Sequence, residues 1–226
     1  MSTYYKLVLF VRFLGYFSLL TGLLALLFIL GPLGLAEARY RSDQLLGVKR
    51  TLPKIIKSDQ TQATTSATPL PKVSLTPLSI DPIDTNFGIV IEKINANSKV
   101  IADVSPTDER QYGRALLQGV AHAQGTAYPG QKGNIYLFSH STDAPWNIIR
   151  FNAVFYLLRE LEPGDRVVMF YQNKRYDYLV YDKRVVSSTD VSFLTNQYDQ
   201  SVLTLQTCDP PGTLINRLII RAKLEE

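Results

Sequence analysis

The sequence predicts a mostly β domain that closes into a barrel with short helices, preceded by one transmembrane helix and a linker. Three observations lead to this prediction. Residues 13–36 carry no charged side chain, residues 58–79 are rich in Thr, Ser and Pro, and residues 86–226 consist mainly of short β-branched runs between turns. Many short strands with few helices are typical of sheets that close on themselves.

The first 36 residues contain the predicted membrane anchor. As a helix, the 24 uncharged residues at 13–36 would be about 36 Å long, and the hydrocarbon core of a bilayer is about 30 Å thick. A cleaved signal peptide is the alternative, because Ala36-Glu37-Ala38 has the form of a cleavage site. The apolar run is longer than the usual signal-peptide core of about 7–15 residues, which favours a retained anchor.

The net charge of +4 is concentrated next to this anchor. Residues 37–57 carry six Lys or Arg and two acidic residues, whereas residues 58–226 carry 16 positive and 18 negative groups, a net charge of −2. A folded part without excess positive charge gives no reason to expect a nucleic-acid partner. We therefore expect membrane lipid, and no nucleic acid, among the partners.

Residues 37–85 connect the anchor to the folded part. The basic stretch 37–57 is interspersed with Leu, Val and Ile, which fits either a short interfacial helix on anionic lipid or the solvated base of a stalk. Residues 58–79 have no aromatic side chain and cannot build a core, which predicts an extended linker. The expected organisation is an anchor at 1–36, this connecting segment at 37–85, and a folded β domain at 86–226.

Within the domain, β-branched runs and turn residues divide the chain into strands and a few helices. A helix is predicted at 108–118, after cap-forming residues. A second is predicted at 147–161, where apolar residues recur about once per turn and Glu-Pro-Gly-Asp ends the pattern. A hairpin is expected to turn at 172–174. Strands are predicted at 88–94, 100–104, 134–139, 166–171, 175–186, 201–207 and 218–224.

The only cysteine, Cys208, stands at the end of one predicted strand, just before an Asp-Pro-Pro-Gly turn. A single cysteine excludes an internal disulfide and cysteine-rich zinc sites. Lone cysteines are most often buried and inert, but Arg217 stands at the start of the next predicted strand. An accessible thiol beside a permanent positive charge is the environment in which reactive cysteines are found.

Two motifs extend this interpretation. Residues 204–208, Thr-Leu-Gln-Thr-Cys, are followed by Arg217 nine residues on, and residues 119–140 form a glycine-rich block that ends in His140. Together they resemble the signature of the sortases, the cysteine transpeptidases of bacterial cell surfaces. The resemblance covers about residues 86–224, although Ser141 stands where many members carry an arginine. It implies a closed eight-stranded barrel of the sortase type.

The charges around the anchor bear on its orientation. The positive-inside rule taken alone favours a cytoplasmic domain, because the segment after the anchor is more basic than Lys6 and Arg12 before it. Large domains translocate largely regardless of such charges, and the resemblance implies an outward-facing enzyme. We therefore expect a single-pass protein of the cell membrane with an extracytoplasmic catalytic domain.

The expected chemistry uses three groups. Cys208 is the expected nucleophile, because a thiolate can attack a backbone carbonyl. His140 is the expected general acid, because imidazole can protonate a leaving amide nitrogen near neutral pH. Arg217 is expected to stabilise the oxyanion, since its charge is constant. The alternatives are an inert thiol, a histidine bonded only to the backbone, and an arginine in a surface ion pair.

Further residues are candidates for supporting the site or binding substrate: Thr207, His122, Asp143, Trp146 and Asn147. Thr207 is expected to lend its hydroxyl or backbone to the oxyanion region, and His122 to be hydrogen-bonded in the wall near the cleft. Asp143, Trp146 and Asn147, which follow His140 in the sequence, are expected to orient it or line the groove. No metal or cofactor is expected, although some sortases bind calcium through scattered acidic residues.

By resemblance, the reaction is cleavage of a Leu-Pro-x-Thr-Gly sorting signal between Thr and Gly. The surface protein becomes a thioacyl-enzyme, which an amine of a peptidoglycan precursor or a pilin lysine then resolves. One alternative is a membrane-anchored binding module with an inert cysteine. Another is a peptidoglycan enzyme like the L,D-transpeptidases, although those place glycine before the cysteine and arginine two residues after it, where Thr207 and Pro210 stand here.

Overall fold

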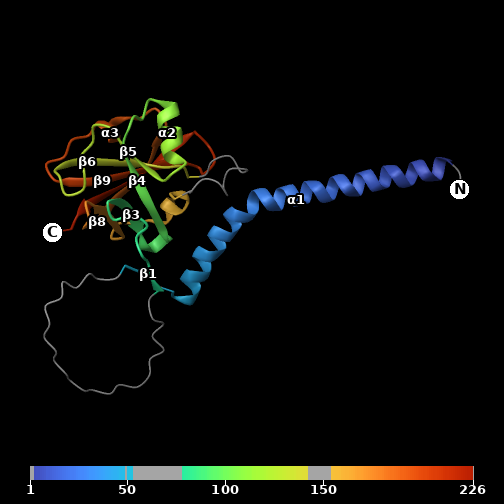
Figure 1. Ribbon diagram of the computed structural model, residues 1–226, viewed down its shortest axis with the longest axis horizontal. Coiled ribbons are helices and arrows are strands. Elements are labelled where there is room, and N and C mark those ends of the chain that lie inside the picture. Colours follow the sequence, from blue (N-terminus) through green and yellow to red (C-terminus); the bar gives the residue numbers. More distant parts are fainter. Residues whose placement is uncertain (1–2, 49, 53–77, 142–153, 226) are drawn as a thin grey trace, which may run out of the picture.

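The computed structural model describes residues 3–48, 50–52, 78–141 and 154–225. In this part of the chain eight strands form a closed barrel, in the order β10-β8-β7-β3-β4-β5-β6-β9 (Figure 1). The predicted fold class is thereby confirmed. The barrel strands are β3 (Phe87–Ile91), β4 (Ala96–Val104), β5 (Val120–Ala123), β6 (Gly133–Phe138), β7 (Arg166–Tyr171), β8 (Lys174–Ser187), β9 (Ser201–Asp209) and β10 (Asn216–Leu224).

Alternating side chains build the core of the barrel. Leu203 and Leu205 of β9 and Leu218 and Ile220 of β10 belong to the main hydrophobic core, while the residues between them face outward. Most neighbouring strands are antiparallel, but β4 pairs with β5, and β6 with β9, in parallel. Because β6 and β9 run in the same direction, their C-terminal ends meet at the same edge of the barrel.

Short helices lie between the strands: η1 (Glu92–Ile94), α2 (Glu109–Leu116), η2 (Tyr156–Glu160) and α3 (Ser192–Thr195). The Asp108 carboxylate caps α2 by accepting hydrogen bonds from the backbone N–H groups of Arg110 and Gln111, as the sequence predicts. Of the predicted helix 147–161, residues 147–153 lie outside the described part, and η2 is a single short 3₁₀ helix. The predicted strand 88–94 is wrong at its end, because η1 turns the chain there. The sequence prediction includes neither β5 nor α3.

The N-terminal helix α1 (Thr3–Leu46) is 44 residues long and continues past residue 36. Its segment Tyr4–Phe28 is long and apolar enough to cross a membrane. Figure 1 shows that α1 is bent before it reaches the barrel. The sequence Gly-Pro-Leu-Gly at 31–34 falls in this helix, and proline, which has no N–H to donate, is a common cause of helix bends.

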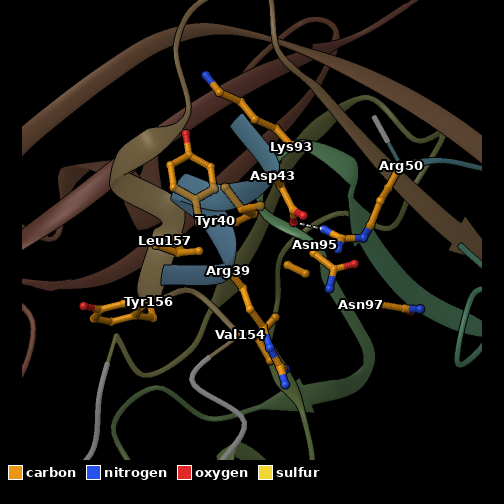
Figure 2. Close-up of a pocket in the computed structure, with 12 residues that line it drawn as sticks. Arg39, Tyr40, Asp43, Arg50, Lys93, Asn95, Asn97, Val154, Tyr156 and Leu157 are labelled. Carbon is orange, nitrogen blue, oxygen red and sulfur yellow. Dashed lines mark hydrogen bonds and ion pairs between the residues drawn. The ribbon is translucent and has the colours of Figure 1, made fainter. Parts of the chain in front are cut away.

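The last turns of α1 pack on the barrel. Glu37 forms an ion pair with Arg159 of η2 at 2.9 Å, Tyr40 packs against the main hydrophobic core, and Asp43 pairs with Arg50. A hollow of about 270 Å³ remains between this end of α1, η2 and the turn after η1. Figure 2 shows the side chains that line it. Residues 37–46 are thus the end of a helix packed on protein, which neither expectation for the basic stretch included.

A small parallel sheet lies beside this contact, where β1 (Arg50–Thr51) pairs with β2 (Leu78–Ser79). Leu52 and Ile80, which follow these strands, are buried against side chains on the outer faces of β3 and β7: Val90, Val168 and Phe170. Residues 53–77, which include most of the predicted linker, lie outside the described residues, but the segments that flank them pair with each other. The number of residues at 53–77 therefore does not set the distance between the barrel and the end of α1.

Candidate active site

Cys208 and Arg217 lie side by side on the neighbouring strands β9 and β10, and His140 follows two residues after the end of β6, which borders β9 on its other side. Arg217 of β10 is directly opposite Cys208 of β9. Phe138 of β6 is at the level of Gln206, and the backbone N–H of Ser139 donates to the Gln206 carbonyl at 3.2 Å. Two residues further along each chain, His140 therefore reaches the level of Cys208. We call these three residues the candidate row.

The candidate row faces away from the packed interior of the barrel. Successive side chains of a strand point to opposite faces, and the residues that alternate with Cys208, such as Leu205, belong to the interior. Both Cys208 and His140 are half-buried. These two side chains are therefore partly shielded from water and partly accessible.

The Cys208 thiol is free. Burial raises its pKa above the ordinary thiol value, and the positive charge of Arg217 acts in the opposite direction. Side chains directly opposite in an antiparallel pair have Cβ atoms about 4.5–5.5 Å apart, which accounts for the influence of the guanidinium. Burial thus favours the neutral thiol, and the positive charge of Arg217 beside it favours the thiolate.

Arg217 is held by its own loop. Its Nη1 donates hydrogen bonds to the carbonyl oxygens of Leu214 at 3.3 Å and Asn216 at 3.0 Å. A guanidinium has five N–H groups in one plane, so donors remain for a substrate oxygen. The loop bonds restrict the rotation of the side chain and keep it on the side of Cys208.

Thr207 braces the site from behind. It is 3% exposed, faces the interior, and donates a hydrogen bond from Oγ1 to the carbonyl oxygen of Ser139 at 2.9 Å. The bond joins the strand ends that carry Cys208 and His140. The hydroxyl proton is therefore engaged with the Ser139 carbonyl oxygen. The other form of the expectation, that the Thr207 backbone serves the oxyanion region, stays a prediction.

His122 lies inside the barrel and is not brought to the candidate row. Its Nε2 donates to the Ala127 carbonyl oxygen at 3.0 Å, the Asp103 N–H donates to Nδ1 at 3.4 Å, and its ring packs against Phe87 and Tyr128. Burial lowers its pKa. These contacts describe a neutral, structural histidine. Asp143, Trp146 and Asn147 lie outside the described residues, so their proposed roles stay predictions.

Tyr136 and Gln206 also belong to the surroundings of the candidate row, and the sequence interpretation did not include them. The Tyr136 hydroxyl donates a hydrogen bond to Gln206 Oε1. Burial raises the Tyr136 pKa, and the charge of Arg217 opposes that shift, which places the phenol within the field of the guanidinium. The sequence signal that could have identified Tyr136 was alternation. Residues 136 and 138 share one face of β6, and His140 follows two residues later.

Comparisons with known proteins agree with this architecture. A family model described as "Sortase domain" matches residues 89–225, more than half of the chain. Sortase D of Bacillus subtilis (strain 168) is 29% identical over 136 residues, which make up 59% of this chain and only 60% of that protein's length.

Two solved structures extend the comparison. A Sortase D5 transpeptidase of Clostridium perfringens is 26% identical with a TM-score of 0.51, over 65% of this chain and 82% of that one. Sortase C-1 of Actinomyces oris is 26% identical with a TM-score of 0.53, over 64% and 76% of the two chains. The family match begins in β3 and ends just after β10, so it spans the whole barrel and every residue of the candidate row. The chain belongs to the sortase family of cysteine transpeptidases.

Proposed function

We propose that this chain is a membrane-anchored enzyme that cleaves LPxTG-like sorting signals and transfers the surface protein to an amine. The observation that carries the proposal is the candidate row, in which the thiol of β9 lies opposite the guanidinium of β10 and the imidazole follows the end of the adjoining strand β6. A thiol nucleophile, a proton carrier and a fixed cation are the groups that acyl transfer from a peptide requires.

In the first half of the proposed reaction, Cys208 is acylated. His140 accepts the thiol proton, and the resulting thiolate attacks the carbonyl carbon of the threonine in the sorting signal. Free donors of Arg217 stabilise the negative oxygen that forms. The bond to the glycine nitrogen then breaks as the imidazolium donates its proton to that nitrogen. The products are a thioester at Cys208 and a free glycine amine.

In the second half, an acceptor amine attacks the thioester carbon. Its extra proton passes to His140, and the imidazolium returns a proton to the departing Cys208 sulfur. The new amide links the surface protein to the acceptor, either a peptidoglycan precursor or a pilin lysine. If water takes the place of the amine, the same sequence gives hydrolysis.

The proposed location is the outer side of the cell membrane. The apolar segment Tyr4–Phe28 of α1 would act as a single-pass anchor, and the barrel would be extracytoplasmic. Substrate and enzyme would then share one membrane surface, where a high effective concentration compensates for weak binding of a short motif.

Mass spectrometry of the purified full chain tests the function directly. Incubation with an LPxTG-type peptide should add the mass of the acyl fragment to the tryptic peptide that contains Cys208, and an amine should remove it. Cys208→Ala should keep the fold and give neither adduct nor cleaved peptide. A chain that binds the peptide without releasing its glycine end would instead be the binding module considered above.

A further inference from the structure

Gln206 lies on the outer face of β9, in the same line of side chains as Cys208. Its neighbours across the sheet are Phe138 in β6 and Ile219 in β10. Two residues of a strand advance about 6.6 Å, so the two side chains are separated by the length of two residues of an extended peptide. Gln206 is half-buried, which leaves part of its amide accessible.

The Tyr136 hydroxyl fixes the orientation of that amide. It donates its hydrogen bond to Gln206 Oε1, and Tyr136 itself is only 4% exposed. With Oε1 held toward Tyr136, the two N–H groups on Nε2 point away from it. Within the ranges that the structure describes, no protein acceptor binds these N–H groups.

The side chains packed around Gln206 are mostly apolar, and some of them are partly exposed. Four buried side chains pack together there: Ala123, Tyr136, Phe193 and Ile219. Three partly buried ones lie against them: Phe138, Val186 and Leu194. Ligand sites are commonly built as an apolar surface with a small number of placed polar groups, since the area contributes binding energy and the polar groups fix orientation.

We propose that Gln206, held by Tyr136, binds the acyl-donor peptide by donating a hydrogen bond from Nε2 to a peptide carbonyl. This carbonyl is the one two residues before the scissile carbonyl, because that spacing matches the separation of Gln206 from Cys208 along β9. The inference rests on the proposed function, since Cys208 sets the position of the scissile bond.

The acyl side of the peptide, and not the leaving side, occupies this surface. The acyl segment stays attached to Cys208 until the amine arrives, so contacts to it keep the intermediate oriented for the second step. The leaving segment must depart and open its place to the acceptor. A donor two residues from the thiol therefore sets the register of the peptide for cleavage and retains it for transfer.

The test removes the proposed bond from each partner. In one peptide a thioamide, a weaker acceptor, replaces the amide two residues before the scissile carbonyl; a control peptide carries it one residue before. In the full chain Tyr136→Phe and Gln206→Leu are combined, so that no buried hydroxyl loses its partner. Gln124→Leu makes the same exchange at an exposed glutamine at the end of β5 and should match wild type.

We expect the double variant to lose about three- to tenfold in kcat/KM, mainly through KM, as for one neutral hydrogen bond. Its Cys208 alkylation rate should stay at the wild-type value. The thioamide at the target position should slow wild type by a similar factor but change the double variant by less than about twofold. The control thioamide should affect both proteins equally.

Two results would overturn the proposal: a double variant as active as wild type, or a target thioamide that slows both proteins equally. If the double variant is unstable, Gln206→Met replaces Gln206→Leu in it, because methionine keeps the unbranched length of the side chain, lacks a donor and adds no charge. A wild-type chain that cleaves neither the amide peptide nor its thioamide forms would contradict the proposed function instead.

Discussion

At the scale of single residues, Arg217 combines a fixed position with unused donors. Two carbonyl oxygens of its own loop accept from one terminal nitrogen, and the rest of the planar guanidinium stays available. A lysine ammonium is a compact charge on a flexible stem. It cannot bind the loop and present a plane of donors toward Cys208 at the same time.

We therefore expect Arg217→Lys to be severely impaired although its charge is kept. The loss of a placed oxyanion donor typically costs about 10²–10³ in rate. The measurement is kcat/KM on a sorting-motif peptide for wild type and variant. A lysine variant within about threefold of wild type, far from that loss, would show that Arg217 acts only by proximity of charge.

The protonation of Cys208 gives a second prediction at this scale. Burial raises the thiol pKa and Arg217 lowers it, so removal of the cation should raise it further. The rate of Cys208 alkylation as a function of pH should therefore have its midpoint at higher pH in Arg217→Ala than in wild type.

Because Cys208 is the only cysteine, the alkylation signal comes from one site, and Cys208→Ser serves as the blank. An Arg217→Ala profile that coincides with the wild-type profile would mean that the guanidinium charge does not reach the sulfur.

At the scale of elements, β6 and β9 are held together at the candidate row by the bond from Thr207 to Ser139. Thr207→Val keeps the shape of the side chain and leaves the Ser139 carbonyl without this donor. We expect a loss of about 1–3 kcal/mol in the free energy of unfolding and a lower kcat, because the strand end that carries His140 is less firmly held.

Urea unfolding and steady-state kinetics measure the two effects of Thr207→Val. Thr189→Val, at an exposed position, is the matched control and should stay within about 0.5 kcal/mol of wild type. Equal stability of the two variants would show that the hydrogen bond from Thr207 to Ser139 does not stabilise the fold.

The strands differ in how far the sequence alone could predict them. β9 has a clear alternation of apolar and polar residues, and the turn after it marks its end. β5 has four residues that are all buried, so alternation gives no signal there. The packing of α1 was equally hidden, because Glu37 and Arg159 are 122 positions apart and no local pattern links them.

The candidate site divides in the same way. Cys208, His140 and Arg217 stand at strand ends beside turns, which the sequence marks plainly. The pairing of Tyr136 with Gln206 joins residues 70 positions apart and depends on the parallel register of β6 and β9. The side chain of Thr207 faces the barrel interior because Thr207 is two residues from the core residue Leu205. The sequence alone does not show which face of β9 is the interior one.

At the scale of the whole molecule, the N-terminal region contributes to the stability of the barrel. A chain that begins at residue 78 lacks Tyr40 and Leu52, which are packed on the barrel. We expect it to fold, since the eight strands are complete, but with a melting temperature lower by roughly 5–15 °C than that of a chain beginning at residue 37.

Calorimetry on the two shortened chains measures this difference in melting temperature. Leu52→Ala in the longer chain measures the part of the difference that is due to Leu52, which we expect to be the largest. Equal melting temperatures would show that the N-terminal contacts are too weak to matter. The independence of residues 86–226 as a folding unit stays a prediction until this is done.

Because β1 and β2 are neighbours, the chain leaves the fold after residue 52 and returns at the same place. If α1 anchors the chain as proposed, insertions or deletions at 53–77 would leave the distance of the barrel from the bilayer unchanged. The height would follow instead from the length and bend of α1, which rises about 1.5 Å per residue. It would not follow the behaviour of a flexible linker, whose reach grows with the square root of its length. Under the proposed function, the barrel would be held close to the bilayer by a helix, so the flexibility needed to bring a sorting signal to Cys208 would have to come from the substrate.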